Sequence, residues 1–177
     1  LGIVGKIGSG KTSLARQFLA IYPAESGEVL IDDRPLEDYS KESVRDRVAY
    51  VPQNHILFSK TIYENVLFGQ VDASEEKVME ALEFSDFKKD LGVFSQGLKT
   101  TIGEKGISIS GGQKQRISIA RALIKEADIL ILDDSLSAVD GITEENILKN
   151  MKETRGGKTN IIIAHRLSGV RDADLII

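Results

Sequence analysis

Short apolar runs alternate with amphipathic stretches along the chain, and this pattern predicts strands that alternate with helices. The run Ile129–Leu132 is uninterrupted by polar residues, which is typical of a parallel strand buried on both faces. The predicted strands are Leu1–Val4, Gly27–Ile31, Val48–Val51, Ile129–Leu132 and Asn160–Ala164, and residues 174–177 read as the start of another.

The stretches between these runs carry apolar residues at helical spacing. One predicted helix follows Gly10, with apolar positions from Leu14 to Tyr22, and another opens at Ser110. Further helices are predicted at about 41–47, 74–91 and 143–153. The alternation predicts an α/β fold with a mostly parallel sheet flanked by helices.

Residues 54–69 fit neither pattern, because they read as irregular and yet unusually apolar. They form either a small core beneath a loop or a docking surface for another chain. Residues 32–35 read as a turn punctuated by Pro35. Residues 100–106 read as a loop whose notable carboxylate is Glu104.

Composition narrows the class of protein. The 177 residues are 41% hydrophobic and 28% charged, as in an ordinary single globular domain. The net charge of -4 argues against a nucleic-acid surface, and the absence of cysteine excludes disulfides and thiolate metal sites. No apolar run approaches the length of a membrane helix. Since both ends read as strand interiors, we expect a fragment of a longer chain.

The first strand leads into a glycine-rich loop that matches the phosphate-loop pattern G-x-x-x-x-G-K-[ST] over Gly5–Thr12. Glycines let successive backbone N–H groups face an anion, and the following helix adds its free amides and positive dipole end. Lys11 supplies a mobile positive charge, and Thr12 offers a hydroxyl to Mg²⁺. The predicted ATP-binding residues are Gly5, Lys6, Gly8, Ser9, Gly10, Lys11, Thr12 and Ser13.

Polar residues also follow three later strands. Asp133 and Asp134 come directly after a buried strand, where Asp133 can hold Mg²⁺ and Asp134 can orient or deprotonate a water. Gln53 and His165 stand at the ends of two other predicted strands, where open parallel sheets present ligand-binding residues. His55 has no such placement and reads as a surface or packing residue.

A second glycine-rich helix start lies at Ser110–Gln113. Ser110 and Gln113 have the spacing of a capping box. Gly111 and Gly112 each cost a helix about 1 kcal/mol relative to alanine. A sequence that keeps both glycines favours exposed backbone N–H groups, so this is a second candidate anion site.

Taken together, these motifs resemble the ATP-binding domain of ABC transporters. In order along the chain, the motifs correspond to the Walker A loop (Gly5–Thr12), the Q-loop (Gln53), the signature (Ser110, Gly111, Gly112 and Gln113), Walker B (Ile129–Asp133), the D-loop (Ser137–Asp140) and the switch histidine (His165). Residues 101–106 and 58–65 are similar to loops of the exporter type.

The resemblance implies a P-loop ATPase with ATP and Mg²⁺ as cofactors. It implies metal contacts from Thr12, Gln53 and Asp133, and catalysis by Asp134, His165 and Gln53. The core would comprise residues 1–53 and 125–177, with 54–124 as an inserted helical subdomain. Transmembrane domains of the same transporter would be partners at the cytoplasmic face of the cell membrane, with no role for nucleic acid.

In this family two ATPase domains pair head to tail, so Ser110–Gln113 would contact the partner's ATP, near the D-loop residue Asp140. Asp134 departs from the family, where Glu is usual. Misplacing a catalytic carboxylate by about 1 Å can cost about 100-fold in rate. This residue resembles the degenerate half of heterodimeric multidrug exporters, so we expect a slow site and a different ABC ATPase domain as partner. The aromatic residue that stacks on adenine would lie upstream of residue 1.

Other functions remain open on the sequence. One is a non-transport ABC ATPase, and another is an ATP-binding regulatory module in which Asp134 never catalyses hydrolysis. A P-loop kinase is more distant, because it would not need a Ser-Gly-Gly-Gln helix start.

Overall fold

The computed structural model describes residues 1–24, 26–103 and 106–177. Glu104, singled out in the loop at 100–106, lies outside the described residues.

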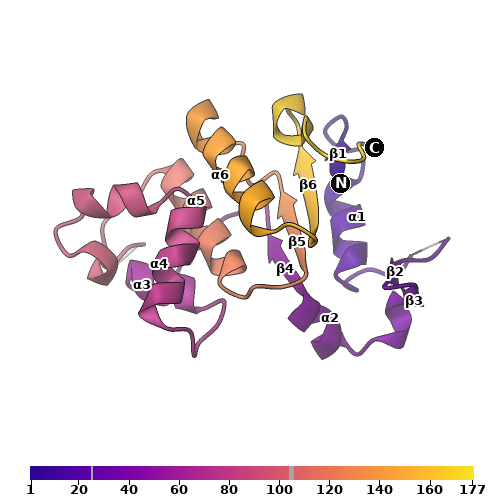
Figure 1. Cartoon of the computed structure of the whole chain (residues 1–177), viewed down its shortest axis with the longest axis horizontal. Helices are drawn as coiled ribbons and strands as arrows, with labels where there is room; N and C mark the ends of the chain where they lie inside the picture. Colours follow the sequence, from indigo (N-terminus) through magenta and orange to yellow (C-terminus); the bar gives the residue numbers. More distant parts are fainter. Residues whose placement is uncertain (25, 104–105) are drawn as a thin grey trace.

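A parallel sheet of four strands forms the centre of the molecule (Figure 1). Its order is β1 (Gly2–Val4), β6 (Thr159–Ala164), β5 (Ile129–Asp133) and β4 (Val48–Val51), and each neighbouring pair is parallel. The chain's last residues lie beside β1, where the Gly2 amide donates to the Leu175 carbonyl at 2.7 Å. The strand start predicted at 174–177 is therefore present as a short pairing with β1.

Helices cover both faces of the sheet. Ala49 and Leu130 point toward α5 (Gly111–Leu123) and α6 (Gly141–Thr154), in one buried cluster. Val48 and Ile131 point the other way, into a cluster with α1 (Lys11–Phe18) and α2 (Lys41–Arg47). Successive strand residues alternate between these clusters, as a strand buried on both faces requires. The predicted α/β fold is confirmed.

Two predicted elements end earlier than their apolar patterns suggested. α1 stops at Phe18, and Ala20 then adopts a φ of 53° that no helix continues. α4 (Glu75–Phe84) begins after the predicted Ser74 cap, but Asp86, with a φ of 58°, ends the stretch predicted to run to 91. A 3₁₀ turn at Lys88–Val93 follows.

The segment at 27–35 is a small hairpin. β2 (Leu30–Ile31) pairs antiparallel with β3 (Arg34–Pro35), so the predicted strand is shorter and only part of the predicted turn is a turn. Asp32 and Asp33 have φ values of 51° and 59°, the left-handed pair that a tight two-residue hairpin requires.

Residues 54–69 contain a helix that the sequence reading missed. α3 spans Ile62–Leu67 and starts at a complete capping box between Thr61 and Glu64. Its buried Ile62 and Val66 join a third cluster with α4 and one side of α5. The irregular reading was wrong for residues 62–67.

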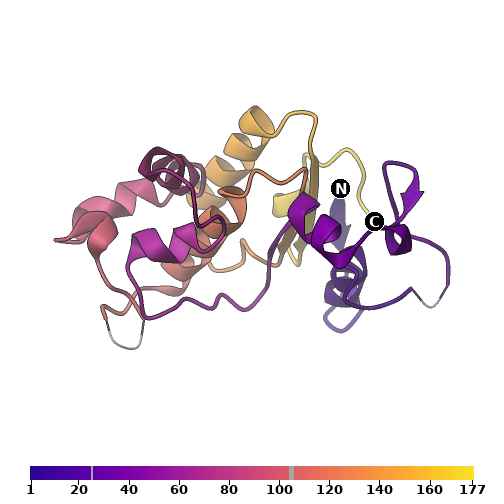
Figure 2. The same cartoon turned by 90° about the horizontal axis from the view of Figure 1, so that it is seen from below.

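The three clusters occupy different parts of an elongated molecule. α3 and α4 lie toward one end of its long axis, and the β2–β3 hairpin lies at the other in both views (Figures 1 and 2). Short 3₁₀ turns occur at Leu36–Asp38, Gly97–Lys99 and Leu167–Val170. Within the described ranges, no helix has the length and apolar content needed to cross a membrane.

Candidate functional site

The loop between β1 and α1 has the geometry of an anion cradle. Gly8 and Gly10 have φ values of 83° and 93°, which side chains rarely allow. Gly10 is also the N-cap of α1, and it offers no side-chain acceptor to the helix's first amides. The Lys11 ammonium folds back over the loop and donates to the carbonyls of Gly5 and Lys6 at 2.8 and 2.9 Å.

At the base of this loop, Thr12 meets the end of β5. Its hydroxyl donates to Asp133 Oδ1 at 3.1 Å, and Asp133 is only 1% exposed. The Tyr50 hydroxyl, at the neighbouring β4, donates to Asp133 Oδ2 at 2.8 Å. Burial, and then this hydrogen bond, raise the pKa of Tyr50, which keeps its hydroxyl a donor. Sequence reading missed Tyr50, because it lies inside a strand with no motif around it.

Asp134 is held by its backbone and by a hydrogen bond from Gln53, with His165 nearby. Its φ of 50° is left-handed, and its amide donates to the Ile163 carbonyl at 2.9 Å. Gln53 Nε2 donates to Asp134 Oδ2 at 3.1 Å, and His165 Nε2 lies 4.0 Å from the same oxygen. The structure thus gathers Gln53, Asp134 and His165 at the carboxyl edge of the sheet, beside the phosphate loop.

His55 is partly buried close to this group. Its Nδ1 is buried without a hydrogen-bond partner among the residues the structure describes. Burial lowers the pKa of His55, and the nearby Asp134 charge opposes that effect. His55 is thus a packing residue more than a surface one.

The helix start at Ser110 has the predicted cap. The Gln113 amide donates to Ser110 Oγ at 3.2 Å, and the Ser110 amide donates to Gln113 Oε1 at 3.0 Å. A Cβ on Gly112 would lie 2.9 Å from the Ala138 carbonyl oxygen, so only glycine allows α5 to approach the 135–140 loop this closely. The first two helical residues carry no side chain, as the sequence predicted from the two glycines.

Buried Gln115 ties α5 to the loop after β5. Its Nε2 donates to the Asp134 carbonyl at 3.4 Å, and its Oε1 accepts from the Ala138 amide at 3.0 Å. Asp140 ends this loop as the N-cap of α6, accepting from the Thr143 amide at 3.0 Å. That amide and the Thr143 hydroxyl lower the pKa of Asp140.

The two candidate anion sites do not meet within the described part of the chain. No hydrogen bond joins Ser110–Gln113 to the phosphate loop in residues 1–24, 26–103 and 106–177.

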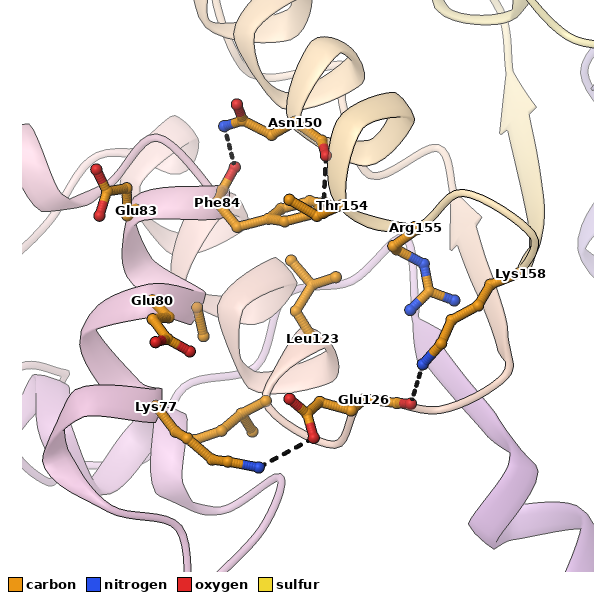
Figure 3. A pocket seen from close by; sticks show the side chains of 12 residues that line it. Lys77, Glu80, Glu83, Phe84, Leu123, Glu126, Asn150, Thr154, Arg155 and Lys158 are labelled. Carbon is orange, nitrogen blue, oxygen red and sulfur yellow. Dashed lines mark hydrogen bonds and ion pairs between the residues drawn. The ribbon is translucent and has the colours of Figure 1, made fainter.

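A cavity of about 690 Å³ lies elsewhere, between α4, α5 and α6 (Figure 3). The side chains of Phe84 and Leu123 face its centre. At its edge, Asn150 Nδ2 of α6 donates to the Phe84 carbonyl at 3.0 Å. A Lys77–Glu126 ion pair at 2.9 Å closes another side. None of the phosphate-loop residues lines it. A smaller cavity of about 220 Å³ is lined by Asp134 and His165.

The oxygen donors suit Mg²⁺. Among the described residues, no group of three or more His, Cys, Asp or Glu side chains could enclose a metal. Thr12 and Asp133 already place a hydroxyl and a carboxylate oxygen 3.1 Å apart beside the phosphate loop. Mg²⁺ takes one or two such protein oxygens, and waters and phosphates complete its shell.

Comparison with known proteins gives a consistent picture. The family model described as ABC transporter matches residues 1–137. A structure of a bacterial Atm1-family ABC exporter with ATP bound is similar over 99% of this chain, with 38% identity and a TM-score of 0.94, and 31% of that chain is covered.

Two curated relatives are also similar over nearly the whole chain. The probable multidrug resistance ABC transporter ATP-binding/permease protein YheI of Bacillus subtilis is 51% identical over all of this chain, which covers 30% of that protein. The mitochondrial iron-sulfur clusters transporter ATM1 of Saccharomyces cerevisiae is 41% identical over 99% of the chain and 26% of that protein. The chain thus spans about a third or less of the length of these relatives.

Proposed function

The chain belongs to the ABC transporter family as an ATPase domain, and we propose that it powers substrate export within a longer protein. The observation that carries this proposal is the contact between Thr12 and Asp133, which joins the phosphate loop to the end of β5 at 3.1 Å. Exporter relatives of similar sequence support the direction of transport.

We assign the phosphates of ATP to the cradle of Gly5, Lys6, Gly8, Ser9, Gly10, Lys11, Thr12 and Ser13. Within the described residues, Lys11 donates to two carbonyls and, at 3.5 Å, to Ser9 Oγ, and to no carboxylate, so its charge is available to a phosphate. Thr12 and Asp133, with Gln53 nearby, would hold Mg²⁺. When bound, that ion offsets negative charge on the phosphoryl group being transferred.

Asp134, Gln53 and His165 are the proposed catalytic group. The Asp134 carboxylate would orient or deprotonate the attacking water, and Gln53 and His165 would hold that carboxylate from two sides. Asp134 is one methylene shorter than the Glu usual in the family. We therefore propose that hydrolysis at this site is slow, since a carboxylate withdrawn by about 1 Å loses about 100-fold in rate.

A second ABC ATPase domain, paired head to tail, is the proposed partner. Its support is the glycine-bearing start of α5, which makes no hydrogen bond to this chain's own phosphate loop within the described residues. Ser110, Gly111, Gly112 and Gln113 would then serve an ATP held by the other domain. Asp140, in the loop tied to α5, would lie at the same interface. A partner with a full-length catalytic Glu would compensate for Asp134, so we propose a heterodimer.

Membrane domains of the same transporter are the other proposed partner. Ile56, Phe58 and Phe68, around the start and end of α3, are 69%, 40% and 56% exposed, and we propose that they are the docking surface for these domains. This placement would put the domain at the cytoplasmic face of the cell membrane. The separate buried cluster of α3 and α4 supports an inserted helical subdomain at 54–124, between core segments 1–53 and 125–177.

Steady-state ATP turnover of the full-length protein tests the slow-site proposal. Asp134→Glu should raise turnover by about 10- to 100-fold over wild type, because it restores the reach of the carboxylate. Lys11→Ala serves as the blank. Wild-type turnover well above that blank, with no gain in Asp134→Glu, would contradict the degenerate site and the need for a different partner.

A second candidate is an ATP-binding regulatory module that does not hydrolyse ATP, and it is favoured by the same Asp134. Single-turnover cleavage of bound ATP separates the two functions. Cleavage within minutes in wild type, absent in Asp134→Asn, supports slow hydrolysis, whereas no cleavage in either supports the regulatory module.

A further inference from the structure

The docking surface is built on one stacked aromatic pair. The rings of Phe58 and Phe68 stack with centroids 4.5 Å apart and an interplanar angle of 25°. Phe58 precedes α3 and Phe68 is its C-cap, so the surface depends on how the 56–61 segment is held against α3. The structure holds that segment through a buried asparagine, through an arginine and through residues 100–102, where the Ile102 amide donates to the Lys60 carbonyl at 2.9 Å.

Asn65, on α3, is completely buried and makes a dense set of hydrogen bonds. Its Oδ1 accepts from the Phe58 amide at 2.9 Å. Its Nδ2 donates to the carbonyls of Phe58, Lys60 and Thr61 at 3.0, 3.3 and 3.0 Å. The 58–61 backbone is therefore folded around this one amide.

Arg121, near the end of α5, also forms hydrogen bonds to this segment and to Asn65. Its Nε donates to the Asn65 carbonyl at 2.8 Å, and its Nη2 donates to Asn65 Oδ1 at 3.0 Å. Its Nη1 donates to the Ile56 carbonyl at 2.8 Å. The guanidinium carbon also lies 5.4 Å from the centroid of the Phe58 ring. One planar fork thus joins α5 to both α3 and the docking surface, which a lysine could not do.

The backbones of α3 and α5 are also in direct contact here. A Cβ on Gly69 would lie 1.9 Å from the Arg121 carbonyl oxygen, so only glycine fits at the end of α3. α5 is a continuous 13-residue helix from this contact back to its cap at Ser110. Arg121 lies eight residues after Gln113, which is about 12 Å along the helix.

We propose that Arg121 is a positioning residue that makes the docking surface and the Ser110–Gln113 helix start move as one body. It does not touch ATP in this chain; it acts through the backbone of residues 56–61. The inference rests on the proposed function, because it requires that residues 110–113 at the start of α5 move when ATP binds. It also requires that a partner bind the docking surface.

Amide hydrogen exchange of the full-length protein assembled with its partner ATPase domain, with and without Mg-ATP, tests this role. In wild type, Mg-ATP should slow exchange at three places together: 5–12, 110–115 and 56–61. In Arg121→Lys, we expect the slowing at 56–61 to fall from about tenfold to less than about twofold, while 5–12 and 110–115 respond as before.

Two variants serve as controls. Arg45→Lys changes an exposed arginine on α2 and should respond as wild type does. Phe58→Leu removes the ring but leaves every guanidinium hydrogen bond, so the response at 56–61 should persist.

Three results are decisive. Undiminished ATP-dependent slowing at 56–61 in Arg121→Lys would overturn the proposal, because the signal would then run through Gln53 or another route. Faster exchange at 56–61 with and without ATP, but with the same ATP-dependent slowing, would also overturn it, since Arg121 would then only stabilise the fold. Absence of slowing at 5–12 in wild type would instead contradict ATP binding and the proposed function.

Discussion

The phosphate-loop region and the helical region, which comprises α3, α4 and α5, differ in whether their cations are paired with carboxylates. Lys11 lies over the loop and, among the residues the structure describes, donates to carbonyl and hydroxyl oxygens and to no carboxylate. Arg116, on the helical side, is clamped by the Asp90 carboxylate at 3.0 and 2.8 Å and also donates to the Asp86 carbonyl. The side chains of that pair are 10% and 15% exposed.

This difference separates activity from stability within one chain. A cation kept free of carboxylates contributes little to folding but is ready for a polyanion. A buried cation with a carboxylate partner cannot bind a ligand, and its loss leaves an uncompensated charge inside the protein. Substitutions in the two regions should therefore change different measurements.

Arg116→Met should have the largest effect and should act on stability. It leaves Asp90 buried without its ion-pair partner, which costs about 3–5 kcal/mol of unfolding free energy. Urea unfolding followed by circular dichroism measures this loss, with exposed Arg45→Met as the control. A loss no larger than the control's would mean that the helical region does not depend on its internal charge pair.

Lys11→Ala should show the reverse. In the faster Asp134→Glu background, we expect Lys11→Ala to lower ATP turnover by about 10²- to 10³-fold, because a charge aimed at the phosphates is removed. The unfolding free energy should change by less than about 0.5 kcal/mol, as for other surface substitutions. Lys149→Ala is the matched control, because that lysine side chain on α6 is exposed. A large loss of stability in Lys11→Ala would break the contrast between the regions.

Tyr50→Phe sharpens the comparison. Tyr50 lies near the phosphate loop, but like Arg116 it donates a hydrogen bond to a buried carboxylate, so its loss should reduce stability. Removing its hydrogen bond to the Asp133 carboxylate should cost about 1.5–3 kcal/mol of unfolding free energy. Tyr39→Phe is the control, since that hydroxyl donates to the neutral Ile31 carbonyl at 2.9 Å and should cost about 1 kcal/mol. Equal costs would mean that the charge of Asp133 adds nothing.

The smallest effect should be on the pH dependence of stability. Burial alone would raise the pKa of Asp90, but hydrogen bonds from Arg116 and Gln113 outweigh it and lower the pKa. A carboxyl whose pKa is lower in the folded state stabilises the fold above its unfolded pKa of about 4, and loses that contribution as the pH falls.

Unfolding free energies measured from pH 6 down to pH 3 should therefore fall less steeply in Asp90→Asn than in wild type. Glu42→Gln, an exposed carboxylate on α2, should leave the slope unchanged. Identical slopes in all three proteins would show that Asp90 is not a source of acid sensitivity.

Elements set by local chemistry could be predicted from the sequence. The helix at Lys41–Arg47 and the strand at Val48–Val51 have the predicted bounds. The capping box at Ser110 has both of its hydrogen bonds. α3 was missed although Thr61 and Glu64 have the same spacing, because the apolar run around it obscured the capping signal.

Contacts between distant segments could not be predicted in this way. Tyr50 and Asp133 are 83 residues apart, and Arg121 and Asn65 are 56 apart. No local pattern distinguishes Tyr50 from any other strand tyrosine, or Arg121 from any other helix arginine. Such pairs arise only when the sheet order and the packing of α3 on α5 are known.

The left-handed backbone at Asp134 constrains how this position can evolve. Asp adopts a φ near 50° more readily than longer side chains do, because its short carboxylate tolerates that conformation. Glu in the same conformation would carry more backbone strain, so the backbone itself favours retaining the aspartate, whatever its effect on hydrolysis.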